Sequence, residues 1–179
     1  MDNTPRITAR IDVGRTHQTI KGFGQSGCWW ASSWPQFHSE EALDRALAYM
    51  YSPTEGIGLT HYRYNVGGGT TLETLPAGRH TQCIEVSPGV YDLSVDAINI
   101  GVMEKVLALG AQHVTLFMNS PPARMTNSGF TSGALDGSSN LNMAYADEYA
   151  RYLVDIADLL ADSGIPVTYI SPINEPQHE

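Results

Sequence analysis

The stretch Leu59–Gly69, LTHYRYNVGGG, decides the fold class of this chain. Side chains along a β-strand point alternately to the two faces of a sheet. Tyr62, Tyr64 and Val66 therefore share one face, which we expect to pack on helices, and Gly67 begins a glycine run that ends the strand. The side chains on the opposite face are all polar: His61, Arg63 and Asn65.

Strands and helices alternate along the rest of the chain. The expected strands cover residues 19–23, 59–66, 113–118 and 167–173, and the expected helices begin near Ser39, near Ser94 or Asp96, and near Ala144. This alternation is typical of an α/β fold with a parallel sheet. It predicts about the first half (strands 1–4) of a (β/α)8 TIM barrel, which needs about 250 residues; a small open α/β sheet is the alternative. Before the first of these strands, Ile7 to Val13 alternates apolar and polar residues, as a half-buried strand does.

The composition excludes several classes of function. The net charge is −9, and ten Lys and Arg residues scattered over 179 form no basic face, so we expect no nucleic-acid partner. No apolar run approaches the roughly 18 residues of a membrane span, and Met1–Arg6 opens without the apolar core of a signal peptide. We expect no membrane partner. Cys28 and Cys83 allow one disulfide, but two buried thiols are the preferred interpretation.

Polar residues follow the ends of the strands, where parallel α/β folds build their sites. His, Arg and Asn on an interior sheet face are costly unless they serve a site, although a strand edge in water would also tolerate them. Asn119 follows the third strand, where two prolines stiffen the loop, and an ordinary loop is the alternative. Glu175 follows the fourth strand; apolar neighbours such as Ile170 and Ile173 would favour its neutral form, as a general acid requires. The alternative for Glu175 is a surface charge.

Trp29 and Trp30 follow the first strand of the alternating series. Core packing is the usual role of tryptophan. Two adjacent tryptophans on a turn cannot easily both be buried, and flat aromatic rings at a site suit the apolar faces of sugars. We therefore expect them to line a sugar site.

Motifs for cofactors and metals are weak. GFGQSG, from Gly22 to Gly27, fits the dinucleotide pattern G-x-G-x-x-G, but we expect no helix to start at Cys28-Trp29-Trp30. The six histidines are dispersed, and Pro176 interrupts the Glu175–His178 spacing. We expect no cofactor and no metal.

Taken together, the stretches IKGFGQSGCWWA, GIGLTHYRYNVGGGT, NSPPARMTNSGFTSG and YISPINEPQ resemble glycoside hydrolase family 30 over nearly the whole chain. The resemblance implies a retaining β-glycosidase on a (β/α)8 barrel, with Glu175 as general acid/base. It implies that Asn174 binds the sugar 2-hydroxyl and that Arg63 orients the carboxylates. The remaining residues that the resemblance places in sugar subsites are Trp29, Trp30, Asn65 and Asn119.

The resemblance also divides the chain. It implies that residues 1–18 give a strand to a side β-sandwich and that residues 19–179 form the first half of the barrel. Members place the nucleophile Glu on a later strand, so this chain would hold the acid without the nucleophile and need a missing C-terminal half or a pairing chain. Substrates in the family include β-1,6-galactan, β-1,6-glucan, xylan and glucosylceramide, of which β-1,6-galactan is the best match. Members are often secreted or periplasmic. The alternative is a non-catalytic half-barrel that binds carbohydrate or assembles with another chain.

Overall fold

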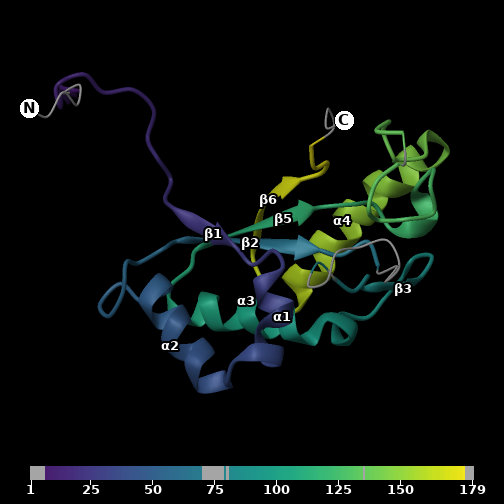
Figure 1. The fold of residues 1–179 in the computed structure, drawn as a ribbon, viewed down its shortest axis with the longest axis horizontal. Helices are drawn as coiled ribbons and strands as arrows, with labels where there is room; N and C mark the ends of the chain where they lie inside the picture. Colours follow the sequence, from purple (N-terminus) through teal and green to yellow (C-terminus); the bar gives the residue numbers. More distant parts are fainter. Residues whose placement is uncertain (1–6, 70–78, 80, 135, 176–179) are drawn as a thin grey trace, which may run out of the picture.

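The computed structural model of the chain describes residues 7–69, 79, 81–134 and 136–175. A parallel sheet of four strands, in the order β1-β2-β5-β6, forms its centre (Figure 1). The strands are β1 (Gly24–Ser26), β2 (His61–Val66), β5 (His113–Met118) and β6 (Val167–Ser171). The predicted α/β class with a parallel sheet is confirmed. The sheet is open in the described part of the chain, with β1 and β6 at its edges, so the barrel stays a prediction.

Helices connect successive strands. The helices are α1 (Trp30–Phe37) and α2 (Glu40–Tyr51) after β1, α3 (Ala97–Leu109) after β2, and α4 (Ala146–Asp162) after β5. Short 3-10 turns, η1 (Leu93–Asp96), η2 (Ala123–Met125) and η3 (Met143–Tyr145), and a hairpin of β3 (Glu85–Ser87) and β4 (Val90–Tyr91) complete the described elements.

One face of the sheet packs on the helices and forms the core. Tyr62 and Tyr64 of β2 are 1% exposed and Val66 is 0% exposed, which confirms the predicted face. Figure 1 shows α1, α2 and α3 together on one side of the sheet. From the helix side, Leu47 and Leu160 are both fully buried in the same cluster.

Local signals placed most helix ends correctly. The Ser39 hydroxyl accepts a hydrogen bond from the Ala42 N–H at 3.2 Å, which caps α2 as expected. Gly110 ends α3 with a φ of 126°, a backbone region that glycine adopts without strain. Ile98, in the first turn of α3, is 48% exposed.

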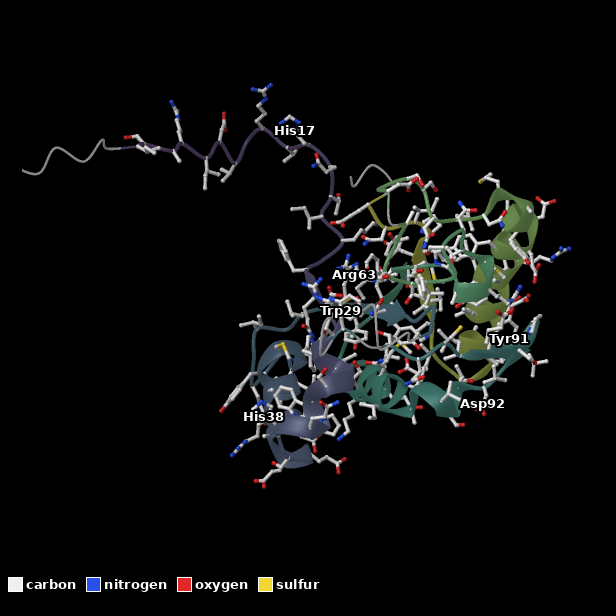
Figure 2. All side chains as sticks on the ribbon, turned by 45° about the vertical axis from the view of Figure 1, so that its right-hand side comes forward. His17, Trp29, His38, Arg63, Tyr91 and Asp92 are labelled. Atoms are coloured by element: carbon white, nitrogen blue, oxygen red, sulfur yellow. The ribbon has the colours of Figure 1, made fainter. Side chains whose placement is uncertain are left out.

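The strand predicted over Ile7–Val13 is wrong. These residues form no strand, and Ile7, Ile11 and Val13 are 91%, 87% and 89% exposed. Figure 2 shows these residues in an arm that leaves the body of the protein and also carries His17. An isolated strand leaves its backbone hydrogen bonds unmade, and no other described segment pairs with this one. The division at residue 18 stays a prediction.

The region after the arm differs from the prediction in two ways. The strand expected over residues 19–23 lies at Gly24–Ser26, and its pairing with β2 begins where the Phe23 carbonyl accepts from the Thr60 N–H at 2.9 Å. A helix does begin at Trp30, although none was expected after the glycine-rich stretch. The helix contains Pro35.

No helix in the described part of the chain is both long enough and apolar enough to cross a bilayer.

Candidate active site

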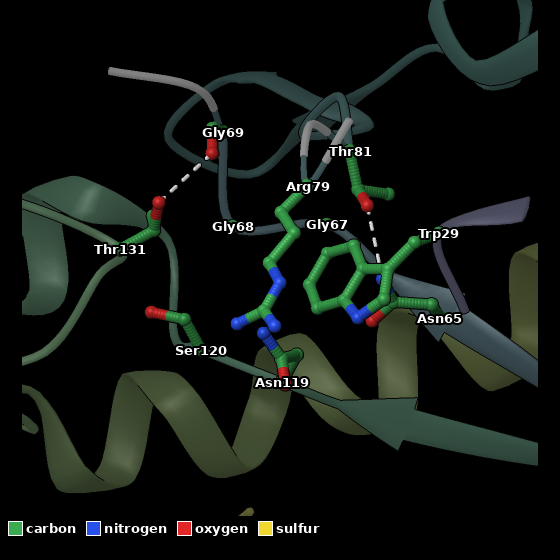
Figure 3. A pocket seen from close by; sticks show the side chains of 10 residues that line it. All are labelled: Trp29, Asn65, Gly67, Gly68, Gly69, Arg79, Thr81, Asn119, Ser120 and Thr131. Atoms are coloured by element: carbon green, nitrogen blue, oxygen red, sulfur yellow. Dashed lines mark hydrogen bonds between the residues drawn. The ribbon is translucent and has the colours of Figure 1, made fainter. Parts of the chain in front are cut away.

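The carboxyl ends of β2 and β5 meet at one edge of the sheet and enclose a small hollow (Figure 3). Its volume is about 20 Å³, close to that of one water, so a sugar ring would rest on its rim. Three predicted residues line it: Trp29, Asn65 and Asn119. The glycines Gly67, Gly68 and Gly69, which follow β2, also line it, together with Arg79, Thr81, Ser120 and Thr131.

Glycine is required where the loop after β2 passes its neighbours. A Cβ on Gly67 would lie 2.2 Å from the Gln82 carbonyl oxygen, and one on Gly68 would lie 2.4 Å from the Pro121 carbonyl oxygen. Any larger residue would therefore push the two loops apart. The glycine run that marked the end of the strand in sequence thus also shapes the hollow.

Within the described part of the chain, Asn65 lines the hollow and has one unpaired acceptor atom. Its side-chain Nδ2 donates to Thr81 Oγ1 at 2.9 Å, as Figure 3 shows, and the residue is only 4% exposed. Its Oδ1 is buried and has no hydrogen-bond partner among the described residues. A buried acceptor without a partner costs about 1–3 kcal/mol, so a ligand hydroxyl that donates to Oδ1 would recover that energy.

The predicted asparagines at the ends of β5 and β6 contact each other. Asn174 Nδ2 donates to Asn119 Oδ1 at 3.1 Å. This bond joins residues 55 positions apart in sequence and brings the Asn174-Glu175 pair to the edge of the sheet that carries the hollow.

Glu175 stands in a strained backbone conformation. Among the described residues other than glycine, only Trp29 and Glu175 have positive φ values, 67° and 42°. Such conformations cost about 1–3 kcal/mol and cluster at functional sites. Both strained residues were predicted to act on sugar, and this coincidence supports the assignment of the site.

The apolar enclosure expected around Glu175 is wrong for the described residues. Glu175 is exposed, and Ile170 and Ile173 are 39% and 53% exposed. The face of the sheet opposite the helices lacks a covering layer among the described residues, so nothing there removes water from these side chains.

Arg63 lies on this uncovered face. Its Nε donates to Ser26 Oγ of β1 at 3.1 Å, and its guanidinium carbon lies 4.1 Å from the centre of the Phe117 ring of β5. The side chain thus spans three strands. A guanidinium held in this way is suited to orient carboxylates at the strand ends.

The two adjacent tryptophans separate. Trp29 lines the hollow, whereas Trp30 packs against the core and donates from Nε1 to the Ser26 carbonyl at 2.7 Å. The structure therefore brings Trp29, and not Trp30, to the hollow, because the helix that begins at Trp30 turns its ring inward.

Arg79 is a residue that the sequence did not single out. Figure 3 shows its guanidinium between the Trp29 indole and Asn119. It belongs to no motif, so no sequence signal pointed to it. It adds positive charge to a rim otherwise made of amides, hydroxyls and an indole.

Both cysteine side chains are less readily ionised than an exposed thiol. Both are unpaired and half-buried, as thiols. Burial raises the pKa of Cys28, although its bond with Ser26 and the Arg63 charge oppose the rise, and burial likewise raises the pKa of Cys83. Within the described ranges, no group of three or more His, Cys, Asp and Glu side chains could hold a metal ion.

The fold and the site define an α/β protein whose open parallel sheet carries a polar site at its carboxyl edge. Residues 6–179 match the sequence profile of O-Glycosyl hydrolase family 30, and the chain belongs to that family. The resemblance found in sequence is thereby confirmed.

Relatives of known name or structure agree with this membership. The chain is 28% identical to the endo-beta-1,6-galactanase of Hypocrea rufa over an alignment of 193 residues. This alignment covers 94% of the chain. It superimposes with a TM-score of 0.79 and 25% identity on a conserved exported protein from Bacteroides fragilis, over 89% of this chain. It also superimposes on the catalytic domain of the family 30 xylanase C from Talaromyces cellulolyticus, with a TM-score of 0.60 and 25% identity over 93% of this chain.

The chain spans only part of these relatives. It covers 40% of the galactanase, 35% of the exported protein and 39% of the xylanase domain. For this chain, the activity of these longer relatives is therefore only proposed.

Proposed function

We propose that this chain is part of a retaining glycoside hydrolase that cleaves a β-linked glycan, with Glu175 as general acid/base. The observation that carries the proposal is the hydrogen bond between Asn174 Nδ2 and Asn119 Oδ1, 3.1 Å long. It holds the Asn-Glu pair at the same strand-end edge as Trp29 and Asn65, where a sugar would rest.

The reaction needs a second carboxylate. Retaining hydrolysis uses two carboxyl groups about 5–5.5 Å apart, one as acid/base and one as nucleophile. Of the described carboxylates, Asp136 lies in a loop and Glu148 lies on α4, bound to Arg124 Nη1 at 2.7 Å, so neither stands at a strand end. We infer that a glutamate outside these 179 residues is the nucleophile and that these residues alone are inactive.

In the complete enzyme each side chain has a defined task. Glu175 protonates the leaving glycosidic oxygen while the nucleophile forms the glycosyl-enzyme, and Glu175 then takes a proton from the attacking water. Asn174 binds the sugar 2-hydroxyl, Arg63 orients the two carboxylates, and Trp29 stacks on the ring. Asn65 accepts a sugar hydroxyl at its free Oδ1. Trp30 supports the site indirectly, through its bond to Ser26.

The family relatives support the rest of the proposal. The length of the relatives, more than twice that of this chain, supports residues 19–179 as the first half of a (β/α)8 barrel. The relative named an endo-beta-1,6-galactanase favours β-1,6-galactan as substrate.

Hydrolysis assays test the substrate. The protein purified from its native host is incubated with β-1,6-galactan, β-1,6-glucan and xylan, and reducing ends are counted. We expect release from β-1,6-galactan, with the β configuration retained in the first product seen by proton NMR. Release from xylan alone would refute the galactan assignment, and an inverted product would refute the retaining mechanism.

The second candidate is a carbohydrate-binding or assembly module. It is favoured by Glu175 being the one described carboxylate placed after a strand of the parallel sheet, and by the partly exposed Trp29 at the rim of the hollow. Trp fluorescence during titration with β-1,6-galactan oligosaccharides distinguishes the two: binding without release of reducing ends by the host-produced protein favours the module.

A further inference from the structure

A second cavity, larger than the strand-end hollow, lies in the helix layer. Its volume is about 440 Å³, within the usual range of small-molecule sites, about 300–1,000 Å³. It lies between α1 on one side and η1 with the start of α3 on the other, and shares no lining residue with the hollow. It therefore belongs to neither the strand ends nor the proposed catalytic site.

Most of its lining is polar and uncharged. The side chains of this kind are Ser32, Ser33 and Gln36 of α1, with Gln82 and Ser94 opposite. Hydroxyls and amides both donate and accept hydrogen bonds. Among the described residues that line the cavity, Asp96 is the only one with an ionisable side chain.

The Asp96 carboxylate can accept further hydrogen bonds. The residue is 4% exposed, and its two oxygens each accept one hydrogen bond, from Tyr64 Oη and from Asn99 Nδ2, both at 2.7 Å. A carboxylate has about four acceptor positions, so about two remain. A ligand hydroxyl in the cavity could donate to one of them.

The rest of the lining is aliphatic: Val95, Ala97 and Ile98. Val95 is 37% exposed and Ile98 is 48% exposed, so apolar surface stands beside the polar groups. A pyranose ring has the same combination, with C–H groups on its faces and hydroxyls at its edge. An anionic ligand would meet the Asp96 carboxylate with no Lys, Arg or His in the described lining to offset the repulsion.

We propose that this cavity binds a neutral pyranose sugar and is a second glycan site, separate from the strand-end site. Two sites on one chain would raise the effective concentration of a long glycan at the other site. The proposal does not depend on catalysis, so it can be tested independently of the hydrolase assignment.

Titration of the ¹⁵N-labelled full-length protein with methyl β-D-galactopyranoside tests it. We expect the backbone amide signals of Gln36 and of residues 94–98 to shift, and to shift equally in Trp29→Ala, which removes the ring at the other site. Shifts confined to the surroundings of Trp29, or no shifts at residues 94–98, would overturn the proposal.

Variants define the contacts. Gln36→Ala with Gln82→Ala removes two exposed amides from the lining, and we expect at least tenfold weaker binding at residues 94–98. Gln112→Ala, an exposed glutamine outside the lining, is the matched control and should bind as the wild type does. Equal binding by the double variant and the control would overturn the proposal.

A blocking variant and a charged ligand complete the test. Ala97→Tyr, at an exposed position of the lining, fills the cavity and should abolish the shifts while circular dichroism shows the fold retained. Undiminished shifts at residues 94–98 would contradict the assignment. D-galactosamine should bind no more than tenfold tighter than the neutral galactoside; a larger preference would indicate a cation site at Asp96 and overturn the neutral-sugar assignment.

Discussion

Asp96→Asn should remove a pH dependence of stability that can be worked out from the structure. Burial raises the pKa of the Asp96 carboxyl from 3.8 to about 6, although its bonds with Tyr64 and Asn99 oppose the rise. The folded chain therefore binds the proton more tightly than the unfolded chain does. Stability falls as pH rises from about 4 to about 6, and the loss is complete above that window.

The size of the effect follows from the shift. Each pKa unit corresponds to about 1.4 kcal/mol, so a shift of about two units gives about 3 kcal/mol. Urea unfolding of wild type and Asp96→Asn, without sugar, between pH 3.5 and pH 8 measures it. The wild type should lose about 2 kcal/mol of this total relative to the variant between pH 4 and pH 7, because asparagine does not titrate.

A neighbouring aspartate is the control with opposite sign. The bond to Ser94 lowers the pKa of the exposed Asp92, so its contribution is present above the unfolded pKa and is lost as pH falls. Asp92→Asn should therefore give a difference that rises with pH. A wild-type-minus-Asp96→Asn difference that is flat or rises with pH would refute the reasoning about burial.

Two further predictions concern ion pairs and glycines. Arg124→Met should destabilise the fold by about 3 kcal/mol in urea unfolding, because it leaves the 2%-exposed Glu85 carboxylate without its partner at 2.7 Å. Lys105→Met removes a more exposed ion pair and should cost less than about 1 kcal/mol. Equal losses in the two variants would contradict the account. Gly67→Ala should lower stability by about 1–3 kcal/mol, because its Cβ would lie 2.2 Å from a backbone carbonyl oxygen. In the same denaturation assay, Gly101→Ala inside α3, with nothing within 4 Å, should raise stability by up to about 1 kcal/mol, and the opposite order would refute the steric argument.

The sequence predicted what depends on near neighbours in the chain. The period of two in β2 gave the buried face of Tyr62 and Tyr64 correctly, because a parallel strand under helices must bury one face. Ser39 before two glutamates gave the start of α2, because an N-cap is a contact between residues three apart. The same kind of signal gave the positions of Asn119 and Asn174 at strand ends.

The sequence failed where the outcome depends on distant partners. Ile7–Val13 has the pattern of a strand, but a strand forms only when a neighbour accepts its hydrogen bonds. Trp29 and Trp30 are adjacent residues of the same kind, but α1 begins between them. The Trp29 ring therefore lies at the hollow, whereas the Trp30 ring packs against the core. Arg79 lines the hollow at a position that no periodic pattern of the sequence encodes.

Chemical rescue of Glu175→Ala tests the central claim most directly. With an activated aryl β-glycoside, the host-produced variant forms the glycosyl-enzyme without acid help but cannot activate water, so that intermediate should persist. Azide needs no base, so it should restore turnover and yield a β-glycosyl azide, while Glu55→Gln, at an exposed glutamate far from the strand ends, should behave as the wild type does. Undiminished hydrolysis of polysaccharide by Glu175→Ala, or an α-glycosyl azide from it, would contradict the assignment of Glu175 as the acid/base of a retaining glycosidase.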